Sequence, residues 1–466
     1  MKRQGCKLSR KLTIGEHKIR LLNDGQKFKK RIYPVPFIFR EEVDRQLEQL
    51  LKEDIIEKSI SPYAHPLVCV VKKDKSLRLA VDYRSINAMT ISDSMPMMRV
   101  NEILYTVGQA DYISTLDATS GFYQIKLDEG SREYTAFVSQ SNLYQFKRMP
   151  FGLKNASASY QRIITEVLQP CKDYALSYID DVGVHTKGIW SKHIEHLDAV
   201  LSEIQKCGLT LRYNKCSFGR QTINFLGHIV GKGTHRPNPQ NLVAIQSLRF
   251  PATKKQMKSL IGLINYYRSY VDHLSERIKP LTEMVKPKMP VMLEPTEKEI
   301  QVFEEVKLML MSAPILRCPD MSKIFIIECD ASKVGVGSTL SQIFDGEQHP
   351  ICYASCSFSV AQQKWSVPEW EAFAILFSVY RYDPWIYGRK VVIYSDHSPL
   401  TYIRQNAPNN PRLGRWVLAL QRYDIIGIHH KRGVDNVCCD SLSRLMTDEY
   451  HDEKPEEIND CAKCFN

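Results

Sequence analysis

Two adjacent carboxylates, Asp180 and Asp181, follow Tyr178 in a short polar turn between two β-prone segments. The flanking segments predict a hairpin over 174–185 with both side chains at its turn. Asp117 ends another apolar segment upstream. Aspartates gathered from separate strands are hard oxygen ligands for a pair of divalent cations, which can activate a hydroxyl and neutralise a triphosphate. Taken singly, each aspartate has an ordinary alternative role in a turn or at a helix N-cap.

A second set of carboxylates lies in the C-terminal part of the chain: Asp330, Glu371, Asp396 and Asp440. Asp330 and Asp396 follow apolar strand-like segments, Glu371 lies on a predicted helix, and Asp440 opens a short one. Together they could hold two metal ions for in-line attack of water on a phosphodiester. Individually, each could equally be a cap, a turn residue or a solvated side chain.

The elements that must position these carboxylates follow from the spacing of apolar residues. In the N-terminal half, this spacing predicts a helix over 41–57, a hairpin over 67–81 with a basic tip, a strand over 112–117, and helices over 156–168 and 193–207. After a proline-rich boundary near Pro239, helices are expected over 254–270 and 297–311. Beyond Pro314, a strand over 324–329, a helix over 369–382 and a strand over 391–394 predict an α/β domain.

The charge of the chain is unevenly distributed. The formal net charge of the 466 residues is +11, but residues 445–466 hold seven acids and two lysines, which leaves +16 on the preceding part. With 23 tyrosines and 17 phenylalanines available for stacking, this excess favours a nucleic-acid partner over a basic protein with merely solvated lysines. The 13 cysteines show no disulfide framework, which indicates reduced thiols. Neither a membrane-spanning run nor a signal peptide is evident, so neither secretion nor a membrane is expected.

Several stretches resemble, in order and spacing, the reverse transcriptase of gypsy-type long-terminal-repeat retrotransposons. They are Lys72-Lys73-Asp74, Leu77–Arg84, Leu116-Asp117 with Gly121–Ile125, Met149–Ala156 and Tyr178–Asp181, continued by Asn214-Lys215-Cys216 and Phe225–His228. Further on, Cys329–Ser332, Glu369–Glu371, Tyr394–His397 and Asp435–Arg444 resemble the ribonuclease H domain that follows this polymerase. The resemblance covers about residues 17–445.

This resemblance implies a multidomain α/β and α+β fold, a right-handed polymerase with fingers, palm and thumb followed by an α/β ribonuclease H domain. The implied divisions are an N-terminal extension (1–40), fingers and palm (41–235), thumb or connection (236–320), ribonuclease H (321–445) and a flexible acidic tail (446–466). The implied activity is RNA- and DNA-directed DNA synthesis with degradation of the RNA strand of hybrids. Two Mg²⁺ ions per active site are expected, with Mn²⁺ as an alternative. The expected partners are an RNA template, a DNA primer, RNA–DNA hybrid, deoxynucleoside triphosphates and other Pol or Gag products, in a cytoplasmic virus-like particle or the nucleus.

The resemblance also implies a role for individual residues. The six aspartates and one glutamate named above would be the catalytic metal ligands of the two sites. Lys72 and Arg78 match residues that contact the incoming triphosphate, although both could be solvated cations. Phe151 and Gly152 match a segment that packs on the nucleotide and template. Phe122 matches an aromatic residue beneath the incoming sugar, although it could be a core aromatic. Lys215 matches a candidate acid for the leaving pyrophosphate, although it could be a surface lysine. His430 matches a histidine that assists product release, although it could be structural.

Three positions depart from the family pattern: Met97, Ser157 and Trp370. None carries a catalytic group. His451, Cys461 and Cys464 suggest a zinc site, but a single Cys-x-x-Cys is weak support against an exposed acidic tail. Two other functions stay open: a host-adopted remnant that binds nucleic acid without catalysis, and an RNA-synthesising polymerase. All seven carboxylates argue against the first, and the ribonuclease H motifs and bulky Phe122 argue against the second.

Overall fold

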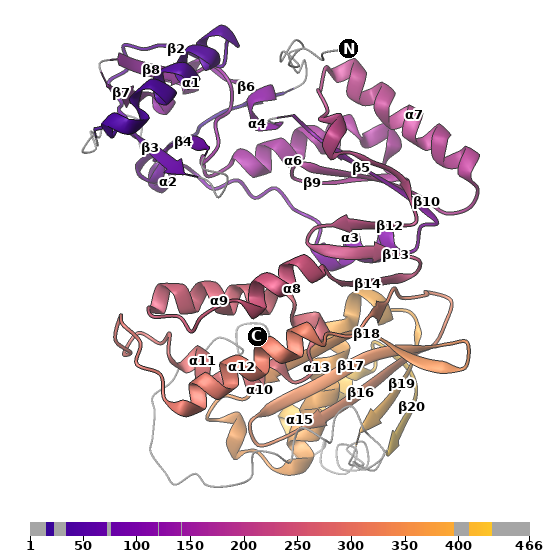
Figure 1. The fold of residues 1–466 in the computed structure, drawn as a ribbon. Coiled ribbons are helices and arrows are strands. Elements are labelled where there is room, and N and C mark those ends of the chain that lie inside the picture. Colours follow the sequence, from indigo (N-terminus) through magenta and orange to yellow (C-terminus); the bar gives the residue numbers. More distant parts are fainter. Residues whose placement is uncertain are drawn as a thin grey trace. The chain divides into compact units, whose positions relative to one another are not determined.

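The computed structural model describes residues 15–22, 34–71, 76–119, 121–140, 142–395 and 410–430. These residues form two compact units, of which one ends at Leu226 and the other begins at Gly227 (Figure 1). Each unit has its own clusters of buried apolar side chains.

The N-terminal unit contains a five-stranded sheet with strand order β2-β8-β7-β3-β4. Its strands are β2 (Ile56–Lys58), β3 (His65–Val71), β4 (Leu77–Val81), β7 (Phe137–Ser139) and β8 (Asn142–Phe146). Helix α1 (Arg40–Lys52) buries Val43 and Leu47 in a cluster with Phe137. This helix ends before the predicted residue 57, because Asp54 takes a left-handed conformation and the chain enters β2. The hairpin of β3 and β4 is confirmed, while its basic tip, 72–75, lies outside the described residues.

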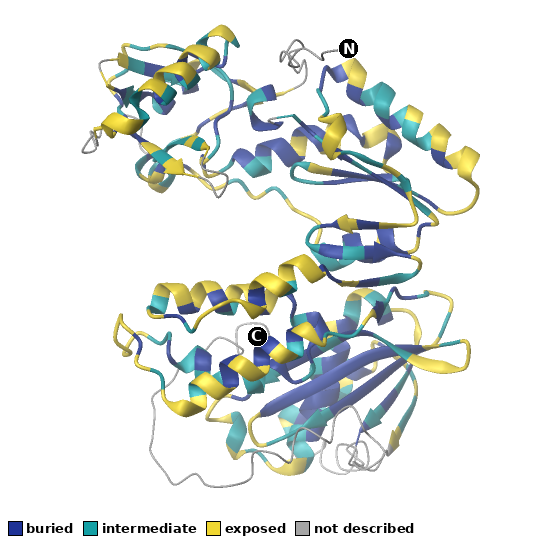
Figure 2. Cartoon of the chain, viewed as in Figure 1, coloured by how far each residue is buried: buried dark blue, intermediate teal, exposed yellow. Residues whose placement is uncertain are grey.

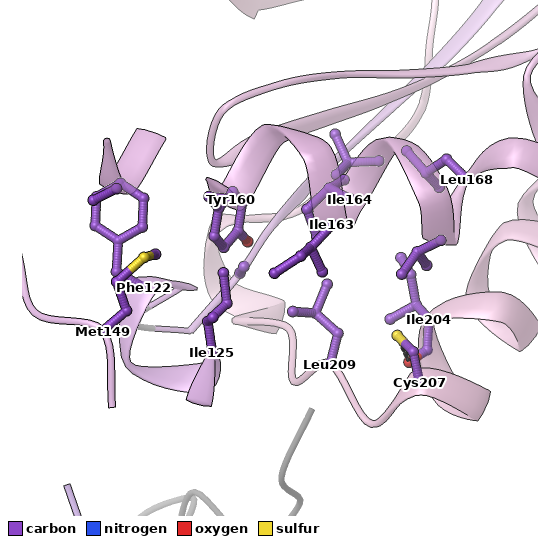
Figure 3. Packing of buried hydrophobic residues seen from close by; sticks show 14 of the residues in the cluster. Phe122, Ile125, Met149, Tyr160, Ile163, Ile164, Leu168, Ile204, Cys207 and Leu209 are labelled. Carbon is purple, nitrogen blue, oxygen red and sulfur yellow. Dashed lines mark hydrogen bonds between the residues drawn. The ribbon is translucent and has the colours of Figure 1, made fainter. Parts of the chain in front are cut away.

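A four-stranded sheet, ordered β11-β5-β10-β9, forms the predicted palm. Its strands are β5 (Tyr112–Asp117), β9 (Ala175–Tyr178), β10 (Asp181–Thr186) and β11 (Ser217–Arg220). Helices α6 (Ala156–Val167) and α7 (Trp190–Cys207) pack on the face that carries Leu116 and Val182 (Figures 1 and 3). Since side chains alternate along a strand, the residues next to Leu116 and Val182 point to the other face.

Further short elements complete this unit. They are β1 (Glu16–His17) and β6 (Lys126–Leu127), which pair in parallel, α2 (Arg84–Met89), α3 (Val100–Gly108), α4 (Gly121–Gln124), α5 (Glu129–Arg132) and β12 (Thr222–Phe225). The side chain of Gln124 is buried and ties α4 to the segment that precedes Lys215: its amide donates to the carbonyl of Thr210 (3.0 Å) and accepts from the Thr210 N–H (2.7 Å).

The C-terminal unit begins with a helical part. The hairpin of β13 (His228–Gly231) and β14 (Thr234–Pro237) pairs with β15 (Leu316–Arg317). Between them lie α8 (Pro239–Gln246), α9 (Lys254–Tyr266), α10 (Leu274–Arg277), α11 (Lys279–Glu283) and α12 (Glu297–Met311). Met257, Leu281 and Phe303 are among the residues that form their common core. The predicted helices are confirmed, although α9 ends at Tyr266 and not at 270.

The C-terminal sheet has five strands in the order β18-β17-β16-β19-β20. β16 (Phe325–Ala331), β17 (Gly335–Phe344) and β18 (Glu347–Ser357) are antiparallel, whereas β19 (Lys390–Ser395) and β20 (Asp424–His430) run parallel to β16. Strands β16 and β17 are buried along most of their length (Figure 2). Helix α13 (Val367–Ile386) covers one face, where the Ser378 hydroxyl donates to that of Ser338 (2.7 Å). Helix α15 (Pro411–Leu420) packs beside α13.

The other face of this sheet contacts residues 268–277, the segment between α9 and α11. Arg268 donates to the carbonyl oxygen of Ser355 (2.8 Å), and the Ser275 hydroxyl donates to the same oxygen (2.9 Å). The ring of His273 lies over Gly337, where an added Cβ would stand 1.9 Å from its Nε2 atom. Position 337 therefore has room only for glycine while His273 stays in place.

Candidate active site

Asp117 and Asp181 lie directly opposite each other on β5 and β10. Opposite residues of an antiparallel ladder project to the same face, so both carboxylates share the face of the sheet away from α6 and α7. Asp180 stands in the two-residue turn between β9 and β10, beside Ile179 with a φ of 55°. A β-branched residue rarely adopts this left-handed conformation, and it persists only where the surrounding structure holds it.

Gln161 on α6 holds this strained turn. Its side-chain carbonyl accepts a hydrogen bond of 2.7 Å from the backbone N–H of Ile179. Its amide group donates to the carbonyl and to the hydroxyl of Ser177, both at 3.0 Å. Since Gln161 is itself buried, these bonds are shielded from water. Helix α6 thus holds the turn that carries Asp180.

The pKa values of Asp180 and Asp181 are both raised. Burial, followed by the charges of Asp181 and Asp117, raises the pKa of Asp180 above its ordinary value. Partial desolvation and the charge of Asp117 also raise the pKa of Asp181, although Lys215 opposes this and the residue reaches solvent. Like charges held together in this way are typical of functional sites.

The donors fit a hard divalent cation. No three His, Cys, Asp or Glu side chains in the described part of the chain are already arranged around a metal position. However, Oδ1 of Asp180 is buried and has no hydrogen-bond partner among the residues described. A cation would supply the missing partner and offset the repulsion between the carboxylates, and carboxylate oxygens are the preferred ligands of Mg²⁺.

An aromatic cluster lies beside the carboxylates. The ring of Phe122 is 4.9 Å from that of Phe151 and 5.4 Å from that of Tyr160, measured between centroids. Figure 3 shows Phe122 and Tyr160 next to each other at the edge of the palm core. Phe122 is 8% exposed and packs in the hydrophobic core. Its predicted place beneath the incoming sugar stays a prediction.

The loop that carries Phe151 and Gly152 is fixed to α2. Gly152 has a φ of 94°, which favours glycine, and its carbonyl accepts from the Asn87 side chain (2.8 Å). The guanidinium of Arg78 lies 5.4 Å from the Phe151 ring centroid. These residues line a cavity of about 340 Å³, together with Tyr83 and Tyr123. Arg78, Phe151 and Gly152 are therefore brought together around one cavity.

Lys215 forms a long ion pair with Asp117, at 3.8 Å between Nζ and Oδ2, and its side chain is 57% exposed. The lysine is therefore next to the carboxylates yet free to move through solvent. Tyr160 and Gln161 also belong to this site, but no motif in the sequence singled them out. Their only signal is a helix predicted to follow the 149–156 stretch.

The second set of carboxylates is described only in part. Asp330 lies near the end of β16 on the face away from α13. Burial lowers the pKa of His273, but the hydrogen bond and charge of Asp272, followed by the charges of Glu276 and Asp330, raise it to about 9. Glu371 on α13 is 1% exposed and accepts a hydrogen bond of 3.1 Å from the Ser395 hydroxyl. Ser395 ends β19 immediately before position 396.

Other predicted site residues cannot be placed. Lys72, Asp396 and Asp440 lie outside the described residues, as do His451, Cys461 and Cys464. His430 ends β20, but its side chain is not among those described. None of the helices in the described ranges is both long and apolar enough to cross a bilayer.

Comparison with known proteins agrees with this geometry. Residues 70–230 match the family model described as reverse transcriptase (RNA-dependent DNA polymerase), and residues 320–423 match that of the RNase H-like domain found in reverse transcriptase. The retrovirus-related Pol polyproteins of the Drosophila melanogaster transposons 297 and opus are 32% and 35% identical to this chain, over 96% and 89% of its length. That of transposon gypsy is 32% identical over 90% of the chain. The chain spans about two fifths of the length of these relatives.

Solved structures share the fold. A foamy viral protease-reverse transcriptase in complex with double-stranded DNA superposes with a TM-score of 0.79 at 22% identity, covering 91% of this chain and 74% of that one. The corresponding complex with RNA/DNA hybrid gives 0.75 at 22% identity, over 97% and 60%. The predicted fold class, a polymerase followed by an α/β ribonuclease H domain, is confirmed. The chain thus combines a reverse transcriptase domain with an RNase H-like domain, and it is similar along most of its length to the Pol polyproteins of gypsy-type long-terminal-repeat retrotransposons.

Proposed function

We propose that this chain is an RNA- and DNA-directed DNA polymerase with ribonuclease H activity that copies retroelement RNA into DNA. The observation that carries the proposal is the pairing of Asp117 opposite Asp181, with Asp180 in the adjoining strained turn. Three acidic side chains at one point of a sheet are costly to the apoprotein and useful to an enzyme that handles a polyphosphate.

Asp117, Asp180 and Asp181 would hold two Mg²⁺ ions, with Mn²⁺ as an alternative. When bound, such ions activate the primer 3′-hydroxyl and offset the charge that develops on the triphosphate. The chain itself fixes the geometry: β5 and β10 set the spacing of two carboxylates, and Gln161 holds the turn that carries the third. Lys215 lies within ion-pair reach of Asp117, which suits a proton donor to the leaving pyrophosphate.

Nucleotide selection would fall to Arg78, Phe122, Phe151 and Gly152. The guanidinium of Arg78 supplies positive charge for the triphosphate, together with Lys72 from the hairpin tip. Phe122, held between Phe151 and Tyr160, offers no hydrogen-bond partner to a 2′-hydroxyl. An unsatisfied hydroxyl would cost a ribonucleotide about 1–3 kcal/mol, which favours deoxynucleotides.

In the C-terminal unit, Asp330, Glu371, Asp396 and Asp440 would hold the ions for hydrolysis of the RNA strand, with His430 assisting product release. The substrates are an RNA template with a DNA primer and the resulting RNA–DNA hybrid. The foamy viral structures that share the fold were solved with double-stranded DNA and with RNA/DNA hybrid, which supports these partners. The protein would act in a cytoplasmic virus-like particle that contains other Pol and Gag products, or in the nucleus.

The decisive experiment is primer extension on an RNA template, run with and without Mg²⁺, beside cleavage of a labelled RNA strand in a hybrid. Asp181→Asn or Asp180→Asn should abolish synthesis and spare cleavage, because each site would hold its own ions. Glu371→Gln or Asp396→Asn should do the reverse, which makes each class of variant the control for the other.

Two results would contradict the proposal. Loss of both activities in either class of variant, with unchanged circular dichroism, would show that the sites are not separate. A wild-type chain that binds template-primer tightly but neither extends nor cleaves it would favour the host-adopted nucleic-acid-binding remnant.

A further inference from the structure

A tyrosine hydroxyl lies in the palm core behind the carboxylate turn. Tyr160 on α6 is fully buried, and its hydroxyl has no hydrogen-bond partner within the described part of the chain. Oδ1 of Asp180 is likewise buried and without a partner there. A buried donor or acceptor that stays unsatisfied costs free energy, and native proteins contain few of them. Tyr160 precedes Gln161, whose side chain bonds the turn that carries Asp180, so the unsatisfied donor and the unsatisfied acceptor belong to segments that are held together.

The hydroxyl of Tyr160 lies close to the start of α4. Its ring meets Phe122 edge-on (Figure 3), and a Cβ added to Gly121 would stand 2.9 Å from the hydroxyl oxygen. Gly121 begins α4, four residues after Asp117. Burial and then the negative charges of Asp180 and Asp117 raise the pKa of Tyr160 far above its ordinary value. A tyrosine hydroxyl is protonated at neutral pH in any case, so it is available as a donor.

We propose that Tyr160 is a positioning residue whose hydroxyl donates a hydrogen bond to Asp180 when this carboxylate binds a metal ion. The inference rests on the proposed function and deepens it. Outer-shell donors orient the carboxylates that ligate metals, and their loss typically lowers metal affinity or activity about 10- to 100-fold. The aromatic ring fills the core, whereas the hydroxyl serves the metal site.

Tyr160→Phe separates these two roles, because it removes only the hydroxyl. Binding of Mn²⁺ is measured by electron paramagnetic resonance on the full chain with a dideoxy-terminated primer, an RNA template and the next deoxynucleotide. The part of the binding that depends on the deoxynucleotide reports the polymerase site. We expect the variant to bind this Mn²⁺ about tenfold more weakly and to need correspondingly more Mg²⁺ for extension. Its metal-free melting temperature should equal or exceed that of the wild type, because the lost hydroxyl had no partner.

Tyr174→Phe is the matched control. It also removes a tyrosyl hydroxyl from the N-terminal unit, but this hydroxyl donates to the Cys171 sulfur (3.4 Å). Its Mn²⁺ binding should equal that of the wild type. Unchanged Mn²⁺ binding in Tyr160→Phe, or an equal loss in Tyr174→Phe, would overturn the positioning role. Absence of any nucleotide-dependent Mn²⁺ binding by the wild type would instead overturn the proposed function, and this inference with it.

Discussion

Replacing Gln161 with leucine should slow DNA synthesis about 100-fold while leaving the fold intact. Leucine is close to glutamine in volume, but it removes the acceptor of the Ile179 N–H and both donors to Ser177. Leaving such a buried N–H unsatisfied costs about 1–3 kcal/mol. Ile179, with its φ of 55°, would then relax toward an ordinary conformation, since the left-handed one costs about 1–2 kcal/mol. A shift of about 1 Å in a catalytic group typically lowers the rate about 100-fold.

Single-turnover extension by one nucleotide, at saturating Mg²⁺ and template-primer, measures this effect without product release. Thr165→Val is the matched control, because it removes only the weaker bond of 3.2 Å from the Gln161 amide to an exposed hydroxyl. It should extend the primer at nearly the wild-type rate. A Gln161→Leu variant with a normal circular dichroism spectrum and a rate within threefold of wild type would refute the reasoning. It would show that the turn keeps its conformation without the bonds from Gln161.

Phe122→Val should raise the frequency of ribonucleotide incorporation 5- to 150-fold, because it relieves the cost of about 1–3 kcal/mol for the unsatisfied 2′-hydroxyl. Deoxynucleotide incorporation should fall less than tenfold. Equal losses in the incorporation of both nucleotides would indicate that the ring is purely structural. Without metal, Asp181→Asn should raise the melting temperature at neutral pH, because the raised pKa values of Asp180 and Asp181 mean that their charged forms destabilise the fold. This gain should vanish as the pH falls through the raised pKa values and the wild-type carboxylates take up protons; a gain that persists in acid would argue against repulsion as its cause. Template-primer affinity should fall steeply between 50 and 200 mM salt, by about 0.7–0.9 log units per log unit of salt for each phosphate contacted. Filter binding measures this affinity, and an affinity that does not change with salt would contradict a basic binding surface.

The strands that carry the carboxylates could be predicted because each is an apolar run that ends in a polar residue. Strands β17 and β18 could not be predicted in the same way, since glycine, serine and cysteine interrupt their apolar residues even where the strands are buried. The register that sets Asp117 opposite Asp181 was also beyond prediction, because it depends on pairing between segments more than 60 residues apart. The roles of Tyr160 and Gln161 depend on which side of α6 meets the turn, and helical periodicity alone does not specify this.

The close approach of His273 to Gly337 constrains how this protein can be recombined. The family match to the RNase H-like domain begins at residue 320, but the ring over position 337 comes from residues 268–277. A chimera that exchanges only residues 320–423 would place the sheet of another protein against His273. Any residue larger than glycine at position 337 would then collide with the His273 ring. Unless the donor also has glycine at this position, the two residues must be exchanged together, and the exchanged segment has to begin upstream of residue 268.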